Sequence, residues 1–351
     1  MNIFYDNTIF SIQRYGGVSR YFSEIIKRIT EYDDVSVDVF KGLSILPYRF
    51  SKLNNVLLDY KLLRHKYDIY HPTYYSALVK KRKGIKTIVT VYDMIHELYS
   101  SKFKILDNGI DTKKKSILNA DHVICISMTT KKDLMKIYNI KDERVSVTYL
   151  GVSLNNQEIA SLIPFARNDM KKPYLLYVGR RSDYKNFKIL LKAFNALNLK
   201  KDFDLVCFGG GMFSKDELIE FKKLQLEDSI KYTEGSDEVL YSYYKNAHIF
   251  IYPSLYEGFG FPVLEAMSNN CMVIASNGGS IPEIAGGAAM LFSPDNVDEL
   301  SSSIQQAIND SHLREEYIKK GRGRAMLFSW DKTAMETYNV YGKVLNGEIR
   351  Q

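Results

Sequence analysis

The sequence is poor in cysteine and tryptophan, with three and one respectively among 351 residues. Cys125, Cys207 and Cys271 lie far apart, in apolar contexts such as "HVICIS" and "LVCFGG". This spacing excludes a disulfide framework and the closely spaced pairs of a cysteine metal site. We therefore expect all three thiols to pack in buried strands.

Long apolar runs are absent too, and none approaches the roughly 18 residues that a membrane span needs. The first residues, "MNIFYD", have neither the basic nor the apolar region of a secretory signal, so we expect a cytoplasmic protein. No Gly-x-Gly-x-x-Gly loop follows the first predicted strand, where "NTIFSIQRYGG" stands instead. This absence argues against a nicotinamide-dependent enzyme.

The chain is long enough for two domains. Short apolar, β-branched or aromatic runs alternate with amphipathic segments, which is typical of β-α-β units around a parallel sheet. The strands predicted in the first half are residues 2–5, 35–40, 68–71, 87–92, 122–127 and 145–150. Those predicted in the second half are residues 174–179, 204–210, 229–234, 248–253, 272–276 and 289–292.

The boundary between the domains is predicted in residues 151–172, which have no clear period and contain Gly, Asn and Pro. We expect two doubly wound α/β domains, 1–155 and 165–330, whose strand ends face each other across a cleft. Residues 331–351 continue a helical spacing of aromatic residues and are predicted to pack back across the junction as a helix.

Positive charge is concentrated in the first half. Residues 1–150 contain 25 Lys and Arg and 16 Asp and Glu, a net charge of +9, whereas the remainder carries −2. The clusters "KKRK" (80–83) and "KKK" (113–115) could attract anionic lipid or acidic substrates, or could be ordinary solvated surface. We expect a possible peripheral contact with an anionic membrane and no nucleic-acid partner.

The segment "YEGFGFPVLEAM", residues 256–267, separates two glutamates by a glycine-rich, apolar stretch. Gly258, Gly260 and Pro262 argue against one helix through both glutamates. We predict a strand, a loop carrying Glu257, and a helix from about Pro262 with Glu265 on its first turn. A glycine loop before a helix start can bind phosphate, although an ordinary corner with a capping glutamate is the alternative.

This segment resembles the donor-binding block of the retaining glycosyltransferases of family 4, which have the two-domain GT-B fold. Other segments agree with the family in order: "QRYGGVSRYFSEI", "TIVTVYDMIHE", "CISMTTKKDL", "VTYLGV", "YVGRRSDYKNFKILLKAF" and "FSWDKTAMETYNVYGKVL". The similarity extends over nearly the whole chain. It implies two Rossmann-like domains and transfer from a nucleotide-diphosphate sugar.

The resemblance also implies roles for individual residues. Gly16 and Gly17 match the family's glycine loop near the donor phosphate. Lys185 matches the lysine on the diphosphate, and either Arg180 or Arg181 matches the arginine beside it.

In the glycine-rich segment, Glu257 matches the glutamate near the transferring sugar and Glu265 the one that holds the ribose hydroxyls. The backbone of Gly258, Phe259, Gly260 and Phe261 is expected to reach the sugar hydroxyls and phosphate.

The chain departs from the family where many members have a histidine before an aspartate, because Tyr92 precedes Asp93 here. A phenol cannot titrate as an imidazole does, which argues against a general-base histidine at this position. Asp93 remains a candidate catalytic residue. His96 could enter the cleft or lie in a loop, and His71 could face the acceptor or make local bonds at its strand end.

The function implied is retaining transfer of a hexose-type sugar from a GDP-, UDP- or dTDP-linked donor to a glycan or lipid-linked acceptor. Surface polysaccharide assembly, as of O-antigen or capsule, is the expected setting. We expect no cofactor other than the donor and no metal ligands. A nucleotide-sugar epimerase of the same fold and a silent sugar-binding subunit are the alternatives.

Overall fold

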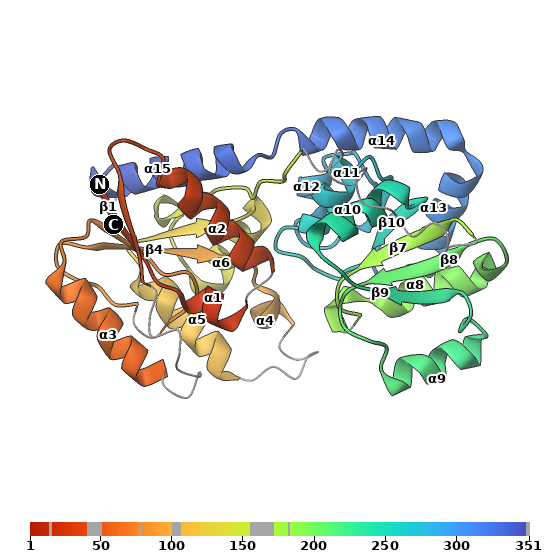
Figure 1. Ribbon diagram of the computed structural model, residues 1–351, viewed down its shortest axis with the longest axis horizontal. Coiled ribbons are helices and arrows are strands. Elements are labelled where there is room, and N and C mark those ends of the chain that lie inside the picture. Colours follow the sequence, from red (N-terminus) through yellow and green to blue (C-terminus); the bar gives the residue numbers. More distant parts are fainter. Residues whose placement is uncertain are drawn as a thin grey trace. The chain divides into compact units, whose positions relative to one another are not determined.

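The structure is a computed structural model of the 351-residue chain (Figure 1). It describes residues 1–13, 16–40, 51–76, 79–99, 107–154, 172–181 and 183–348. The chain divides into two compact units. We call Met1–Gly151 with Ser329–Gln351 the N-terminal unit and Val152–Phe328 the C-terminal unit.

The N-terminal unit contains a parallel sheet of six strands in the order β2-β1-β3-β4-β5-β6. The strands are β1 (Asn2–Tyr5), β2 (Ser36–Val39), β3 (Ile69–His71), β4 (Lys86–Val91), β5 (His122–Cys125) and β6 (Val145–Val147). The helices are α1 (Thr8–Ile12), α2 (Gly17–Ile29), α3 (Ser51–Arg64), α4 (Ile95–Leu98), α5 (Asp107–Asn119), α6 (Met128–Tyr138) and α15 (Trp330–Leu345).

The central strands β3, β4 and β5 are buried along nearly their whole length, as expected of a parallel sheet that helices cover on both faces. One buried cluster includes Phe4, Leu62 and Tyr70, and packs beneath α3. A second includes Val89 and Leu134, beneath α6. The two clusters fix the sheet between its helices.

The C-terminal helix α15 completes the N-terminal unit. It lies alongside α2 (Figure 1). Arg28 of α2 donates from Nε to Asp331 at 2.6 Å, and the hydroxyls of Tyr5 and Tyr341 lie 2.9 Å apart in the core. The predicted terminal helix therefore exists and packs within the first of the two units.

The C-terminal unit contains a second parallel sheet, in the order β12-β11-β10-β7-β8-β9. Its strands are β7 (Tyr174–Val178), β8 (Asp204–Phe208), β9 (Ile230–Thr233), β10 (Ile249–Tyr252), β11 (Val273–Ser276) and β12 (Met290–Phe292). Its α-helices are α8 (Phe187–Ala196), α9 (Lys215–Leu224), α10 (Asp237–Asn246), α11 (Phe261–Ser268), α12 (Ile281–Ala285), α13 (Val297–Asn309) and α14 (Ser311–Ala325).

All twelve predicted strands are present, each within about three residues of the expected bounds. The three cysteines are free and buried, as predicted. Among the described residues, no helix is both long and apolar enough to span a bilayer. The α/β class with two doubly wound parallel sheets is confirmed.

Candidate functional site

The strand order of the C-terminal unit creates a switch point between β7 and β10. The chain proceeds from β7 to β8 on one side, and from β10 to β11 on the other. Loops that leave two such strands in opposite directions open a crevice at the carboxyl edge of the sheet, where ligands of doubly wound folds bind. Lys185 follows β7 and Glu257 follows β10, so both lie at this point.

The Lys185 ammonium lies 2.7 Å from Glu257 Oε1 and 3.2 Å from the Tyr252 hydroxyl. Both charged side chains are mostly buried, and Tyr252 is wholly so. Burial disfavours the ammonium, but Tyr252 and Glu257 outweigh it and raise the pKa of Lys185 well above its usual value. The site therefore holds a permanent cation beside a carboxyl group.

The backbone of Glu257 is fixed by the loop after β11. Ser280 donates both its N–H and its hydroxyl to the Glu257 carbonyl, each at 3.0 Å. Gly279 has a φ of +60°, and a Cβ there would lie 2.4 Å from that carbonyl oxygen. Only glycine permits this approach, which is the physical reason for the sequence "NGGS".

The loop that carries Lys185 is fastened just as firmly. Asn186 donates from Nδ2 to the carbonyls of Pro253 at 3.2 Å and Pro294 at 2.6 Å. The Tyr184 carbonyl accepts from Leu255 N–H at 2.7 Å. The loops after β7 and β10 are thus held together independently of the Lys185 and Glu257 side chains.

The second glutamate lies on α11, which begins at Phe261, one residue before the predicted start. Glu265 is therefore beyond the first turn, and the prediction of a first-turn glutamate is wrong by one residue. Its side chain is buried, with Oε2 3.4 Å from the Tyr244 hydroxyl. Burial and the Glu265 charge raise the pKa of Tyr244, so this phenol stays a hydrogen-bond donor.

Residues 258–261, directly after Glu257, form the turn into α11. Gly260 caps the helix with a φ of +89°, a conformation that favours glycine. Gly258 and Phe259 are buried, and the Phe259 ring meets Phe328 edge-on at 6.1 Å between centroids. The phenylalanine anchors the turn while Phe261 starts the helix.

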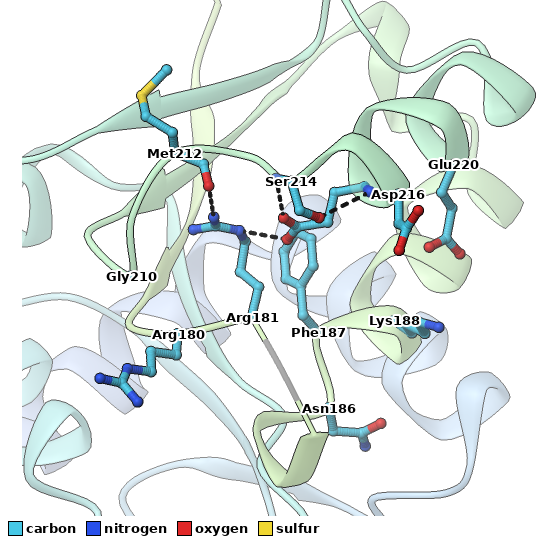
Figure 2. Close-up of a pocket in the computed structure, with 11 residues that line it drawn as sticks. Arg180, Arg181, Asn186, Phe187, Lys188, Gly210, Met212, Ser214, Asp216 and Glu220 are labelled. Carbon is cyan, nitrogen blue, oxygen red and sulfur yellow. Dashed lines mark hydrogen bonds and ion pairs between the residues drawn. The ribbon is translucent and has the colours of Figure 1, made fainter.

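The two arginines after β7 have different surroundings (Figure 2). Arg181 donates from Nε to Glu217 at 2.7 Å and from its terminal nitrogens to the carbonyls of Gly209, Gly211 and Met212. Only 4% of its side chain is exposed. Arg181 therefore fastens the loop between β8 and α9.

Arg180 is exposed, and its side chain points away from Arg181 in Figure 2. Within the described part of the chain, its guanidinium has no hydrogen bond or ion pair. It can therefore accept an anionic ligand without losing a structural contact.

A pocket of about 630 Å³ lies beside these arginines. Besides Arg180 and Lys188, its lining includes Asp216, Glu217 and Glu220 of α9. The three carboxyl groups would repel a diphosphate, and Arg181 already forms an ion pair with Glu217. On charge, the switch point around Lys185 is the better position for phosphate.

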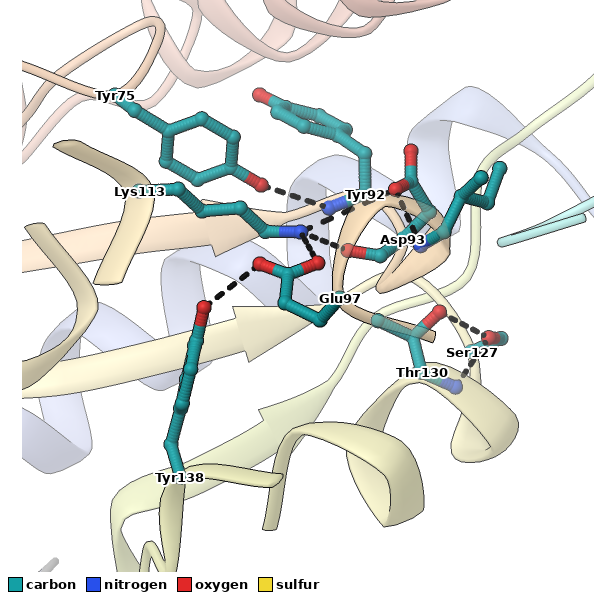
Figure 3. Close-up of polar contacts among 9 residues, drawn as sticks. Tyr75, Tyr92, Asp93, Glu97, Lys113, Ser127, Thr130 and Tyr138 are labelled. Atoms are coloured by element: carbon teal, nitrogen blue, oxygen red, sulfur yellow. Dashed lines mark hydrogen bonds and ion pairs between the residues drawn. The ribbon is translucent and has the colours of Figure 1, made fainter. Parts of the chain in front are cut away.

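In the N-terminal unit, Asp93 follows β4 and stands next to a buried ion pair (Figure 3). Lys113 of α5 donates to the Asp93 carbonyl at 2.6 Å and to Glu97 Oε2 at 2.9 Å. The Tyr138 hydroxyl donates to the other Glu97 oxygen at 2.7 Å. The Asp93 carboxyl accepts from Ile95 N–H at 3.0 Å and is partly exposed. This network orients the loop after β4.

Gly16 and Gly17, which the resemblance matches to the family's glycine loop, lie at the start of α2. Gly16 is the N-cap, and its carbonyl accepts from Arg20 N–H and the Ser19 hydroxyl. Gly17 is the first helical residue. Residues 14 and 15, just before them, lie outside the described part of the chain.

Of the two histidines considered in the sequence analysis, one is buried and the other is exposed. His71 is fully buried, with Nδ1 2.6 Å from the Tyr341 hydroxyl and Nε2 2.8 Å from Thr90 Oγ1. The reading of His71 as facing an acceptor is therefore wrong. His96 is exposed on α4, and Tyr92 packs among Tyr21, Tyr74 and Tyr75.

Acidic residues in the described part of the chain form no cluster that could hold a metal ion. The sequence does contain one Asp-x-Asp, Asp202 and Asp204. It lies at the amino end of β8, opposite the edge that carries Lys185.

Two sequence profiles match the chain. The one described as "Glycosyl transferases group 1" matches residues 160–324, and the one described as "Glycosyltransferase Family 4" matches residues 20–156. The chain belongs to glycosyltransferase family 4. The resemblance inferred from the motifs is thereby confirmed, and this glycosyltransferase carries its Lys185 and Glu257 within the segment matched by the first profile.

Curated relatives agree with the family. The chain is 26% identical to the O-antigen chain mannosyltransferase B of Escherichia coli, over 93% of this chain and 95% of the relative. It is also 26% identical, over 82% and 80%, to a Campylobacter jejuni N-acetylgalactosaminyltransferase acting on a sugar-diphospho-undecaprenol, as its name states.

Solved structures agree with the GT-B fold of this glycosyltransferase. A sucrose-phosphate synthase from Thermosynechococcus elongatus superposes with a TM-score of 0.80 at 18% identity, covering 99% of this chain and all of the other. The Anabaena protein HepE, in complex with UDP-glucose, superposes with a TM-score of 0.75 at 16% identity, covering 98% and 100%. At these identities the likeness establishes the fold alone.

Several residues of the site escaped the sequence analysis. Tyr252 and Tyr244 contact the two glutamates, and Asn186 and Gly279 hold the loops that carry Lys185 and Glu257. The sequence contained one signal for two of these residues. Tyr252 lies at the end of a predicted strand, and the "NGGS" that contains Gly279 follows the next predicted strand. Residues at the carboxyl ends of strands in a parallel sheet lie along the same edge.

Proposed function

We propose that the chain is a retaining hexosyltransferase that takes a sugar from a nucleoside diphosphate and delivers it to a hydroxyl of a glycan or lipid-linked acceptor. The observation that carries the proposal is the contact of Lys185 with Glu257 and Tyr252 at the switch point of the C-terminal unit. The printed functions of the Escherichia coli and Campylobacter jejuni relatives support assembly of a bacterial surface polysaccharide.

The donor diphosphate would bind at Lys185 and Arg180. A lysine ammonium has three donors, and Glu257 and Tyr252 take two of them, which leaves one for a phosphate oxygen. Arg180 adds an exposed guanidinium from the same loop. Two cations can stabilise the charge that develops on a departing diphosphate without a metal ion.

The two glutamates would accept hydrogen bonds from the hydroxyl groups of the donor. Glu265 lies on α11 and would hold the ribose hydroxyls, while Glu257 lies before the helix and would hold those of the transferred sugar. Backbone groups from Gly258 to Phe261 would approach the sugar and phosphate. Gly16 and Gly17 of the N-terminal unit would add backbone N–H groups.

In the proposed reaction, the acceptor oxygen forms a bond to the anomeric carbon on the face from which the diphosphate leaves. The bond from that carbon to the phosphate oxygen breaks, and its electron pair stays on the diphosphate. The acceptor proton moves to this leaving oxygen, so no general base is needed. The protein positions both substrates and stabilises the negative charge. Asp93, on its fixed loop, would orient the acceptor.

We further propose that the protein works at the cytoplasmic face of a membrane, with no cofactor beyond the donor. An epimerase of the same fold is less favoured, because the profiles and both relatives are those of transferases.

The test is a panel of GDP-, UDP- and dTDP-linked sugars incubated with the protein in EDTA, with and without glycan acceptors. We expect acceptor-dependent release of one nucleoside diphosphate and, by NMR, a product with the donor's anomeric configuration. Turnover of a sugar nucleotide to its epimer without an acceptor would contradict transfer. An inverted anomeric centre would contradict retention alone.

A further inference from the structure

The outer face of α3 carries an exposed apolar stripe in its described part. Val56, Tyr60 and Leu63 are 64%, 52% and 75% exposed and recur at helical spacing, so they line one stripe. Leu58 and Leu62, on the opposite face, are buried against the sheet. A surface helix ordinarily carries polar residues on its outer side, but these three exposed positions of α3 are Val, Tyr and Leu. Figure 1 shows α3, in orange, at the outside of the N-terminal unit.

The basic cluster of residues 80–83 lies directly beside this stripe. Asp59 of α3 accepts from Lys80 Nζ at 2.8 Å and from Arg82 at 2.6 Å. The two ion pairs neutralise the acid of the helix and leave Lys81 and Lys83 exposed and positive. A cationic rim therefore adjoins an apolar stripe, although the two are separate in the sequence.

The other end of the stripe is basic as well. Arg64 lies over the Tyr60 ring, 4.9 Å from its centroid, and Lys66 follows in the exposed turn. Tyrosine and arginine are side chains whose apolar parts enter a lipid interface while their polar ends stay at the headgroups.

We propose that the outer face of α3 and the basic cluster at 80–83 form a docking surface for an anionic lipid bilayer. The apolar stripe would enter the headgroup boundary, and Arg64, Lys66, Lys81 and Lys83 would meet anionic headgroups. Only the role of this surface rests on the proposed function: docking would bring the protein to a lipid-linked acceptor.

A second copy of the chain fits this surface less well than a bilayer does. A symmetric contact would place the same cations opposite each other, which is unfavourable. Three apolar side chains are also few beside the roughly 20–30 residues a side of a stable protein interface. A bilayer needs no matching shape, and its charge is complementary.

The test is co-sedimentation of the full-length protein with vesicles of phosphatidylcholine alone or enriched in phosphatidylglycerol, at low salt. We expect binding only to the anionic vesicles. The double variant Val56→Glu/Leu63→Glu and the double variant Lys81→Glu/Lys83→Glu are each expected to weaken binding at least about tenfold. High salt should weaken the wild type by screening the charges.

The matched control is Leu218→Glu/Ile219→Glu, which changes two exposed apolar residues of α9 in the C-terminal unit. It should bind vesicles as the wild type does. Nucleoside diphosphate binding, followed by thermal shift, should be equal in all these proteins and shows that each is folded.

Wild type that does not bind anionic vesicles would overturn the inference, as would α3 and cluster variants that bind as tightly as wild type. A concentration-dependent dimer abolished by Val56→Glu/Leu63→Glu, without vesicle binding, would assign the stripe to a second copy instead. Failure of the proposed transfer activity would be seen in the assay with soluble donor and acceptor, and would leave the vesicle result standing.

Discussion

Lys185 and Glu257 come from loops after different strands, 72 residues apart in the chain, and meet at 2.7 Å. The contact exists because β7 and β10 are neighbours in the sheet although β8 and β9 intervene in the sequence. Tyr252, at the end of β10, accepts a second hydrogen bond from the ammonium, at 3.2 Å. In the proposed complex, Lys185 donates a hydrogen bond to a phosphate oxygen, and Glu257 accepts hydrogen bonds from the hydroxyl groups of the attached sugar.

The division of labour between these two residues can be measured with Glu257→Gln. Loss of the charged acceptor should weaken binding of the intact sugar nucleotide by about 10- to 100-fold, since a hydrogen bond to a charged group contributes about 1.5–3 kcal/mol. Binding of the free nucleoside diphosphate should change little. Calorimetric titration with both ligands compares the two. A variant that loses both affinities equally would place Glu257 on the nucleotide instead of the sugar.

The two neighbouring arginines should respond in opposite ways to substitution. Arg181→Gln removes the ion pair to Glu217 and the bonds to three carbonyls, so the loop between β8 and α9 should lose protection from hydrogen exchange. The free energy of unfolding should fall by about 3 kcal/mol in Arg181→Gln, which is typical when one partner of a buried ion pair is removed. Arg180→Gln should leave exchange unchanged and weaken diphosphate binding about tenfold. The reverse pattern would exchange their roles.

The ion pair beneath Asp93 should matter more to stability than the phenol that supports it. Lys113→Met leaves Glu97 buried without its cation and should destabilise the N-terminal unit by about 3–5 kcal/mol. Tyr138→Phe removes one neutral donor and should cost about 1 kcal/mol. The chain's single tryptophan, Trp330, lies in this unit, so its fluorescence reports the urea transition.

The double variant Lys113→Met/Glu97→Met is the control for that prediction. It removes both charges and should recover most of the lost stability. If it is as unstable as Lys113→Met alone, packing and not charge explains the loss.

Acid should destabilise the N-terminal unit through His71. Burial lowers the pKa of His71 to about 3, against about 6.5 when unfolded. Because the unfolded chain binds a proton that the folded chain refuses, this contribution is complete above about pH 6.5 and is lost as the pH falls toward 3. The free energy of unfolding should drop by about 2 kcal/mol from pH 7 to pH 5 on this account.

His71→Gln should flatten that dependence, since glutamine does not titrate. Buried His122, whose pKa is lowered to about 4 chiefly by burial, acts in the same direction and leaves a remaining slope. Urea titrations at the two pH values, followed by Trp330 fluorescence, measure both proteins. An unchanged slope in His71→Gln would show that the histidine contributes nothing.

The strands could be predicted from the sequence because strands of a parallel sheet covered on both faces are short apolar runs. The residues of the loop between Glu257 and Glu265 could be predicted too, because glycine and proline restrict helix formation locally. What holds these loops could not. Gly279 packs against the Glu257 backbone only after β10 and β11 have paired.

Which polar side chains are buried could not be predicted from the sequence either. Nothing local distinguishes Arg180 from Arg181, because the partner of Arg181 lies 36 residues further on. Lys113 belongs to a run of three lysines, yet only its position on α5 turns it inward to Glu97. His71 ends a strand that would ordinarily carry ligand contacts, but α15 arrives from the far end of the chain and covers it.

The most direct test of the account is donor binding by Lys185→Met compared with Lys188→Met. Lys188 is an exposed lysine three residues further on, so it controls for charge. Calorimetric titration in EDTA with the nucleotide sugar that the panel identifies should show wild-type affinity for Lys188→Met. Lys185→Met should bind at least about tenfold more weakly. Equal affinity in the two variants, or no binding of any nucleotide sugar to the wild type, would contradict a diphosphate site at Lys185.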